Sequence, residues 1–418
     1  MRLSERTLPD RLYATAFALL IVLVLLWGVG HRFYETLLPQ FAAVFGLTGT
    51  GRALTESGYQ IVYFFGAIPA AIIARSFGYK IAILIGLGSV CIGAFTFYPA
   101  AETQGYSYFL FAVMVMAFGW ILLEVAGNPL AMALGSTATA VRRLNLVQAV
   151  YPLGSLLGIY SARWLLQADL ALPKQGFTYS MAHPYIVLGV SVLLLAYLFE
   201  ETRFPPSAQE RRPKLKGVIP EVRALLSEPL FVFAIVAQFS GILVLGTSWF
   251  LADHFFRDSF AQLSDGAIAN VFVGCLILFA LGRIAATALM WQLSPARVLF
   301  FFSLGGVASA LLGSLCGGEI AAFACLALSF FIGPAWPTIF GLAVGGRGLG
   351  MKLAAAVITM GGALGAVAYH FLMAFPPRAT LLVAAAGFML ILAYTLAMPD
   401  SSRKSRARTA EKIRMEPI

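Results

Sequence analysis

Residues 14–38 read ATAFALLIVLVLLWGVGHRFYETLL, an apolar run that is long enough to cross a lipid bilayer as a helix. About 20 residues span the hydrocarbon core, because each residue of a helix rises 1.5 Å. Eleven further stretches of this kind are predicted over residues 55–76, 81–100, 107–131, 145–166, 184–200, 229–252, 267–290, 298–316, 319–343, 353–375 and 380–397. The sequence therefore predicts an all-α integral membrane protein with twelve transmembrane helices.

The composition of the 418 residues agrees with a membrane protein and excludes several other classes. Hydrophobic residues make up 60% of the chain, charged residues make up 11%, and the mean hydropathy is +0.85. A soluble enzyme or a disordered chain does not reach such values. A transmembrane β-barrel is excluded because its strands alternate polar and apolar residues. The four cysteines form no CxxC pair, and we expect neither a metal site nor a cofactor.

One polar segment divides the predicted helices six and six. It runs from Glu200 to Ser227 and is rich in charged residues. We therefore expect an N-terminal six-helix bundle over residues 1–200, a linker over 201–227, a C-terminal six-helix bundle over 228–397 and a basic tail over 398–418. Two bundles around a site near the bilayer midplane are typical of secondary transporters.

The distribution of lysine and arginine predicts the orientation. With the N-terminus inside, 22 of the 29 lysine and arginine residues fall in cytoplasmic segments and five fall in outside loops. Because cations stay on the cytoplasmic side of an inserting helix, we expect both termini in the cytoplasm. The net charge of +10 then indicates contact with the lipid bilayer rather than with nucleic acid. We expect a multi-pass monomer in the inner (plasma) membrane of the cell.

Four charged residues lie inside the predicted spans, where each costs about 2.5–3.5 kcal/mol on insertion scales. They are Arg32, Glu35, Glu124 and Arg283. His31, Arg32 and Glu35 share one face of the first span, with Arg32 and Glu35 one turn apart. Glu35 and Glu124 are candidates for proton coupling, because the proton affinity of a buried carboxyl group depends on desolvation and on nearby charge. The alternative is that Arg32 and one glutamate only neutralise each other. Arg283 can reach the cytoplasmic surface and is predicted to be structural or gating.

Prolines predict irregular backbone at membrane depth. Pro129 has no N–H to offer the carbonyl of Val125, next to Glu124. Pro334 and Pro337 likewise break the tenth span and release the carbonyls of Phe330 and Gly333. Irregular backbone at this depth is tolerated where it lines a cavity. We therefore expect Pro129, Pro334 and Pro337 to have gating or structural roles.

Amide side chains gather near these positions. Asn128 lies one turn after Glu124, and Asn145 and Gln148 lie three residues apart in the fifth span. Gln148 is predicted to face the cavity. Asn145 fits either the cavity or a helix cap near the cytoplasmic side.

Six short motifs resemble the fucose:proton symporter family of the major facilitator superfamily. They run through both halves of the chain: Leu26-Trp27-Gly28-Val29, Leu37-Leu38-Pro39-Gln40-Phe41, Leu123-Glu124-Val125-Ala126-Gly127-Asn128-Pro129, Arg143-Leu144-Asn145-Leu146-Val147-Gln148, Ala237-Gln238-Phe239 and Pro337-Thr338-Ile339-Phe340. The resemblance implies a major facilitator fold with a central cavity and alternating access, and it implies transport of a monosaccharide with a proton.

The resemblance also implies roles for single residues. Glu35 lies where the family has an essential aspartate, Glu124 where it has an essential glutamate, and Gln148 where a glutamine contacts sugar. His31 and Arg32 replace the paired asparagines of the family, and Leu245 stands where a polar residue is expected. The candidate substrate-binding residues are His31, Arg32, Asn128, Asn145, Gln148, Gln238 and Trp336.

The expected function is secondary-active transport, with proton-coupled uptake of a monosaccharide or a sugar-like small solute. One alternative is an anionic metabolite, such as a sugar acid or a carboxylate, because the donor fork of Arg32 suits a carboxylate or phosphate. Another is an exporter or an uncoupled facilitator in which Arg32 and Glu35 stay paired. An enzyme is not expected, because no nucleophile set, metal-ligand cluster or phosphate loop is visible.

Overall fold

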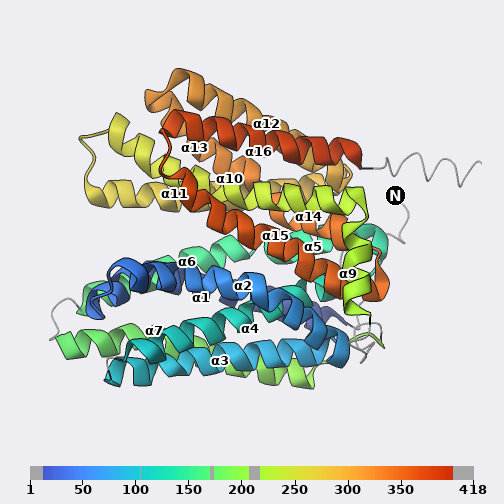
Figure 1. Ribbon diagram of the computed structural model, residues 1–418, viewed down its shortest axis with the longest axis horizontal. Coiled ribbons are helices and arrows are strands. Elements are labelled where there is room, and N and C mark those ends of the chain that lie inside the picture. Colours follow the sequence, from blue (N-terminus) through green and yellow to red (C-terminus); the bar gives the residue numbers. More distant parts are fainter. Residues whose placement is uncertain (1–12, 104, 170–173, 207–216, 399–418) are drawn as a thin grey trace, which may run out of the picture.

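The computed structural model describes residues 13–103, 105–169, 174–206 and 217–398, and these residues form helices and no strand. The helices lie side by side in two layers, with the first half of the chain in the lower layer of Figure 1 and the second half in the upper layer. Among the described residues, 11 helical stretches are long and apolar enough to cross a membrane. The predicted all-α membrane fold is confirmed.

The bounds of the helices follow the predicted spans closely. The first bundle contains α1 (Ala14–Val44), α2 (Gly49–Phe77), α3 (Tyr79–Thr103), α4 (Tyr106–Ala133), α5 (Ala140–Gln148), α6 (Tyr151–Asp169) and α7 (Lys174–Glu201). The helix α9 (Val218–Leu226) precedes the second bundle. That bundle contains α10 (Pro229–Ser259), α11 (Asp265–Leu289), α12 (Pro295–Cys316), α13 (Gly318–Ile332), α14 (Ala335–Val344), α15 (Met351–Leu372) and α16 (Pro377–Ala397).

The fifth and tenth spans are each divided into two helices. The tenth breaks between α13 and α14, at Gly333 and Pro334, as the prolines predict. The fifth was predicted as one helix, but α5 ends at Gln148 and α6 begins at Tyr151. The physical reason is the same, because Pro152 has no N–H to donate to the carbonyl of Gln148. Each bundle therefore contains one span with a free backbone carbonyl near its break.

Small residues allow α1 and α6 to pack with their backbones almost in contact. A Cβ atom added at Gly154 of α6 would lie 2.1 Å from the carbonyl oxygen of Leu25 in α1. One added at Gly28 would lie 2.4 Å from the carbonyl oxygen of Tyr151. Membrane helices associate through such close approaches, because lipid gives them little hydrophobic reason to do so. This contact positions Tyr151 beside the polar face of α1.

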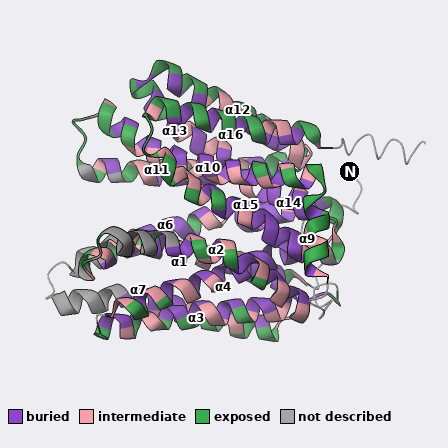
Figure 2. Ribbon diagram, viewed as in Figure 1, coloured by how far each residue is buried: buried purple, intermediate pink, exposed green. Residues whose placement is uncertain are grey.

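The outer faces of the helices are apolar and exposed, whereas the polar residues lie inside. Figure 2 shows exposed residues along outer helices such as α3 and α12. Large apolar side chains on these faces, including Phe65, Leu193, Leu315 and Leu396, are more than half exposed. A large exposed apolar surface marks a contact with membrane or protein, and here it surrounds the whole helical body.

The two bundles meet mainly along five helix pairs. The pairs are α2 with α15, α4 with α15, α5 with α14, α5 with α11 and α6 with α11. The helix α15 therefore lies across the first bundle, as its place in the middle of Figure 1 shows. The surroundings of a side chain on these facing surfaces therefore depend on how the two bundles are placed relative to each other.

The helix α9 ties the two bundles together at one end of the molecule, which we call the α9 end. Arg75 at the end of α2 forms an ion pair with Glu221 of α9 at 2.5 Å. Arg347 donates two hydrogen bonds to the carboxylate of Glu228, at 3.0 and 2.7 Å, and they lower the pKa of that carboxyl group below its usual range. The α9 end is the one that the charge distribution predicts to be cytoplasmic. The residues 1–12, 207–216 and 399–418, including the predicted basic tail beyond Met398, lie outside the described residues.

Candidate transport site

The polar face of α1 forms an ion-paired group in the middle of the membrane-spanning part. Arg32 Nη1 pairs with Glu35 Oε2 one turn further on. His31 Nε2 lies 3.4 Å from the other carboxylate oxygen of Glu35. The Arg32 side chain is only 3% exposed, whereas that of Glu35 is 43% exposed. The sequence left open which glutamate Arg32 pairs with, and the partner in this structure is Glu35.

Arg32 also reaches the opposite bundle. Its guanidinium carbon lies 4.9 Å from the ring centroid of Trp249 in α10 and 5.2 Å from that of Phe272 in α11. A guanidinium group at this distance from an aromatic face is attracted to the ring electrons. The buried cation is therefore balanced by one carboxylate from its own helix and by two rings from the other bundle.

Aromatic residues with polar atoms line the other side of this group. His31 Nδ1 lies 2.6 Å from the hydroxyl oxygen of Tyr151, which follows the break between α5 and α6. The His31 ring stacks on Tyr59 of α2 with centroids 5.3 Å apart, and Tyr59 stacks on Tyr63 at 4.8 Å. Such rings offer both flat apolar faces and hydroxyl groups, which is what a polyol solute needs.

Glu124 lies in α4, away from the ion-paired group. The side chain is almost fully buried, and it accepts a hydrogen bond from Thr359 Oγ1 at 3.1 Å. Thr359 belongs to α15 in the opposite bundle. In the described part of the chain, no charged side chain acts on this carboxyl group. Glu35 has a cation and Glu124 has none, so the two acids have different surroundings.

The amides of Asn128, Gln148 and Asn145 form two separate contacts. Gln148 Nε2 donates to Asn128 Oδ1 at 2.7 Å, which joins α5 to α4. Asn145 donates to the carbonyl of Val141 and accepts from Thr338 Oγ1 of α14 at 3.2 Å. Asn145 therefore links the two bundles near the α9 end, whereas Asn128 keeps its amide Nδ2 without a hydrogen bond to the described residues.

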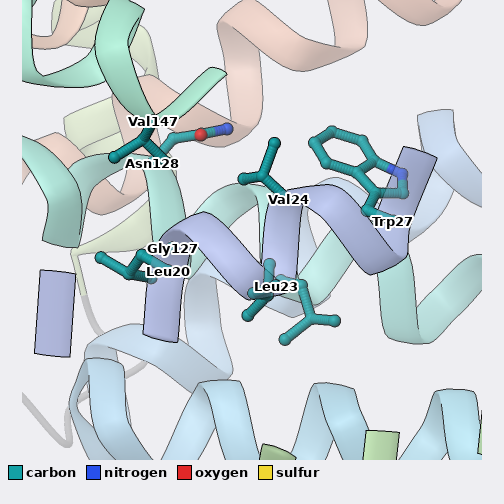
Figure 3. Close-up of a pocket in the computed structure, with 8 residues that line it drawn as sticks. Leu20, Leu23, Val24, Trp27, Gly127, Asn128 and Val147 are labelled. Carbon is teal, nitrogen blue, oxygen red and sulfur yellow. The ribbon is translucent and has the colours of Figure 1, made fainter. Parts of the chain in front are cut away.

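A small pocket lies beside Asn128, as Figure 3 shows. Its walls come from α1, α4 and α5, and the Asn128 amide and the Trp27 indole lie on them. The remaining lining side chains are apolar: Leu20, Leu23, Val24, Leu123 and Val147, with Gly127. Pro129 follows Asn128 directly, and α4 continues through it to Ala133.

Gln238 and Trp336 lie together in the second bundle. A Cβ atom added at Gly362 of α15 would lie 3.7 Å from Gln238 Cγ and 4.0 Å from Trp336 Nε1. The Gln238 side chain is 1% exposed, and neither of its amide atoms forms a hydrogen bond with the described residues. A buried amide without a partner is costly, so a polar group that can bind there would gain two hydrogen bonds.

Arg283 of α11 joins the two broken spans. Its Nε atom donates to the carbonyl of Gly333 at 2.8 Å, and its Nη1 atom donates to the carbonyl of Gln148 at 2.9 Å. These are the carbonyls that Pro337 and Pro152 leave without a helical donor. Arg283 was expected to extend toward water, but its side chain is 3% exposed and is held between the bundles.

Sequence reasoning missed several residues of this site. They are Tyr59, Tyr63, Trp249, Phe272 and Thr359. Tyr59 and Tyr63 carry a signal, because two tyrosines at i and i+4 put two hydroxyl groups on one face of an apolar helix. The other three carry none, since a single tryptophan, phenylalanine or threonine in an apolar helix is ordinary, and only the packing of the two bundles brings them to Arg32 and Glu124.

Two bundles of membrane helices with a buried acid and buried amides at their contact are typical of a secondary-active membrane transporter. No protein-family model matches the chain. The L-fucose-proton symporter of Escherichia coli (strain K12) is 29% identical over 369 residues, which cover 84% of this chain and 84% of that protein. The putative glucose/galactose transporter of Helicobacter pylori (strain J99 / ATCC 700824) is 30% identical over 363 residues, which cover 84% of this chain and 86% of that protein.

The solved structure of the Escherichia coli fucose:proton symporter superposes on this chain with a TM-score of 0.85 at 26% identity, covering 94% of this chain and 100% of that chain. The chain belongs to the fucose:proton symporter family of the major facilitator superfamily. It is a multi-pass protein of the inner membrane, and its relatives are transporters rather than enzymes.

Proposed function

We propose that this protein is a secondary-active transporter that takes up a monosaccharide, or a similar small polar solute, together with a proton by alternating access. It carries out no chemical reaction on the solute. Its two bundles, residues 1–200 and 228–397, move against each other, and the linker of residues 201–227 connects them. Both termini are cytoplasmic, the tail of residues 398–418 contacts anionic lipid, and the protein acts as a monomer.

The observation that carries this proposal is the surroundings of Glu124. The carboxyl group is buried at the contact between the bundles, where a charge without a cation is costly. Binding a proton removes that cost, and opening the contact to water removes it as well. Protonation and conformation are therefore linked at this residue. Glu35 is less suited to bind a proton, because Arg32 already pairs with its carboxylate.

The proposed solute site lies between the two bundles. Asn128, Gln148 and Gln238 offer amides, and Trp336 offers an indole that stacks on Phe340 at 5.0 Å. Sugars bind through such combinations of amide hydrogen bonds and aromatic faces. The relatives named for L-fucose and for glucose and galactose make neutral monosaccharides the first solutes to test.

The remaining candidates contact other side chains of the protein. His31 contacts Tyr151, Arg32 pairs with Glu35, and Asn145 accepts a hydrogen bond from Thr338. We infer that these three residues hold the site in shape rather than bind the solute. Arg283, with the carbonyls that the prolines release, closes the α9 end. An anionic solute finds no unpaired cation at Arg32, which favours a neutral solute over a sugar acid.

Proton movement with the solute tests the proposal. Purified protein in vesicles that contain a pH-sensitive dye is given L-fucose, D-glucose or D-galactose from outside, with no gradient imposed. We expect one of these sugars to acidify the vesicle interior as it enters, and gluconate to have no effect. Entry of the sugar with no change of internal pH would identify an uncoupled facilitator instead.

A further inference from the structure

Thr359 uses its hydroxyl group differently from many other threonines and serines in the described helices. A threonine in a helix commonly donates its hydroxyl proton to the carbonyl four residues earlier. Thr96 donates to Ile92 in this way at 2.7 Å, and Thr287 donates to Arg283 at 2.7 Å. Thr359 instead donates to Glu124, at 3.1 Å, across the contact between the two bundles. Its side chain is 3% exposed, so water does not replace this contact.

The other polar groups around Glu124 belong to its own bundle. Thr359 is the hydrogen-bond donor to Glu124 that comes from the opposite bundle. Tyr59 and Tyr63 of α2 face the carboxyl group from its own bundle, and Asn128 and Trp120 lie one turn away on α4. These groups move with Glu124 when the bundles move. The charged groups nearest in the first bundle, His31, Arg32 and Glu35, are engaged with one another.

We propose that Thr359 is a positioning residue that links the protonation of Glu124 to the relative position of the two bundles. The inference rests on the proposed role of Glu124 as the proton carrier. A hydroxyl donor stabilises the carboxylate form of an acid relative to the protonated form. The donor sits on α15 and the acid on α4, so the hydrogen bond forms in the conformation described here and is lost when these helices separate. With the bundles in contact, this hydrogen bond offsets part of the cost that burial adds to the Glu124 carboxylate, and without the bond the buried carboxyl group would hold its proton more tightly.

Infrared difference spectroscopy of the purified protein measures this directly, with no solute. The carboxylic acid band that disappears in Glu124→Gln identifies Glu124, and its intensity is followed as the pH is raised. We expect Thr359→Val, which has the same shape without the hydroxyl, to move the midpoint of this band to higher pH by about one unit, the effect of losing a hydrogen bond to a charged group. Thr359→Ser should restore the wild-type midpoint. Thr96→Val is the matched control, because its hydroxyl bonds only to its own helix.

Transport provides the second readout. In vesicles with an imposed pH gradient, we expect Thr359→Val to shift the pH profile of sugar accumulation in the same direction and to keep sugar exchange. Thr359→Ala takes its place if the valine variant does not fold. An unchanged titration midpoint in both variants would overturn the inference, and so would a shift that serine does not reverse. If Glu124→Gln itself still accumulates sugar with protons, then the proposed function fails, whatever Thr359 does.

Discussion

The guanidinium group of Arg32 is buried, whereas the carboxyl group of Glu35 that pairs with it is partly open. This difference decides what each substitution leaves behind. Glu35→Gln leaves a buried cation that has only the rings of Trp249 and Phe272 to balance it, and an unpaired buried charge is strongly destabilising.

A double-mutant cycle on Arg32 and Glu35 tests this account of the pair. We expect Glu35→Gln to lower the thermal unfolding midpoint in detergent, and Arg32→Gln added to it to recover part of the loss. The coupling between the two changes should be on the order of 1–3 kcal/mol. Losses that simply add would show that the two side chains do not depend on each other.

Single residues also show where sequence reasoning stops. Arg32, Glu35, Glu124 and Arg283 can be found from the sequence, because a charge inside an apolar span is expensive and therefore conspicuous. Their partners cannot be found in this way. The partner of Glu124 is 235 positions further along the chain, and nothing local separates Thr359 from a threonine that bonds to its own helix.

At the scale of helices, the contact between α1 and α6 sets the position of the site, because it brings Tyr151 to His31. We expect Gly154→Ala to destabilise the protein by about 3 kcal/mol or more, since the added methyl group meets the backbone of Leu25 and no flexible side chain can yield. The thermal unfolding midpoint and the yield of monodisperse protein measure this.

Gly88→Ala in α3 is the control for that substitution. A Cβ atom at Gly88 has open space around it, and alanine favours a helix more than glycine does. Its unfolding midpoint should equal that of the wild type or exceed it slightly. A similar loss in both variants would mean that the close approach of α1 and α6 is not the cause.

Both broken spans contain a proline that leaves the carbonyl four residues earlier without a helical donor. The tenth span was predicted to break because Gly333, Pro334 and Pro337 stand together. The fifth was predicted as continuous, although Pro152 alone removes the donor for the carbonyl of Gln148. A single proline kinks some membrane helices and interrupts others, and the choice depends on whether a neighbouring group takes up the free carbonyl. Here Arg283 does so from the opposite bundle.

At the scale of the whole molecule, we expect the hydrogen bonds of Arg283 to help keep the two bundles in contact at the α9 end. Arg283 belongs to the second bundle and donates across the contact to the carbonyl of Gln148, so its loss removes a bond that holds the bundles together. We expect Arg283→Gln to increase the labelling rate of a cysteine at position 338 by about tenfold or more, because each hydrogen bond from a charged group contributes about 1.5 kcal/mol. Thr338 is a buried residue of α14 whose side chain contacts Asn145 of α5.

The labelling is read with Thr338→Cys in a background without the four native cysteines. Arg257→Gln serves as the control, because Arg257 forms an exposed ion pair with Asp253 on its own helix. Equal labelling rates with and without Arg283 would show that the α9 end is closed by other contacts.

The overall architecture was the most predictable level. Twelve apolar stretches and one polar linker predict two six-helix bundles, because length and hydropathy alone decide whether a segment crosses the bilayer. The way the bundles meet was not predictable, since α2 and α15 are both apolar helices with no pattern that pairs them. The transport site lies on that contact, so its residues were predictable one at a time and its geometry was not.

The claim on which this account depends is that Glu124 carries the transported proton. The most direct test measures two activities of Glu124→Gln in the same vesicles, namely sugar accumulation driven by a pH gradient and sugar exchange. Glu319→Gln, at the exposed start of α13, is the control. We predict that Glu124→Gln loses sugar accumulation driven by a pH gradient and keeps sugar exchange, while Glu319→Gln keeps both. Wild-type accumulation by Glu124→Gln would contradict the account.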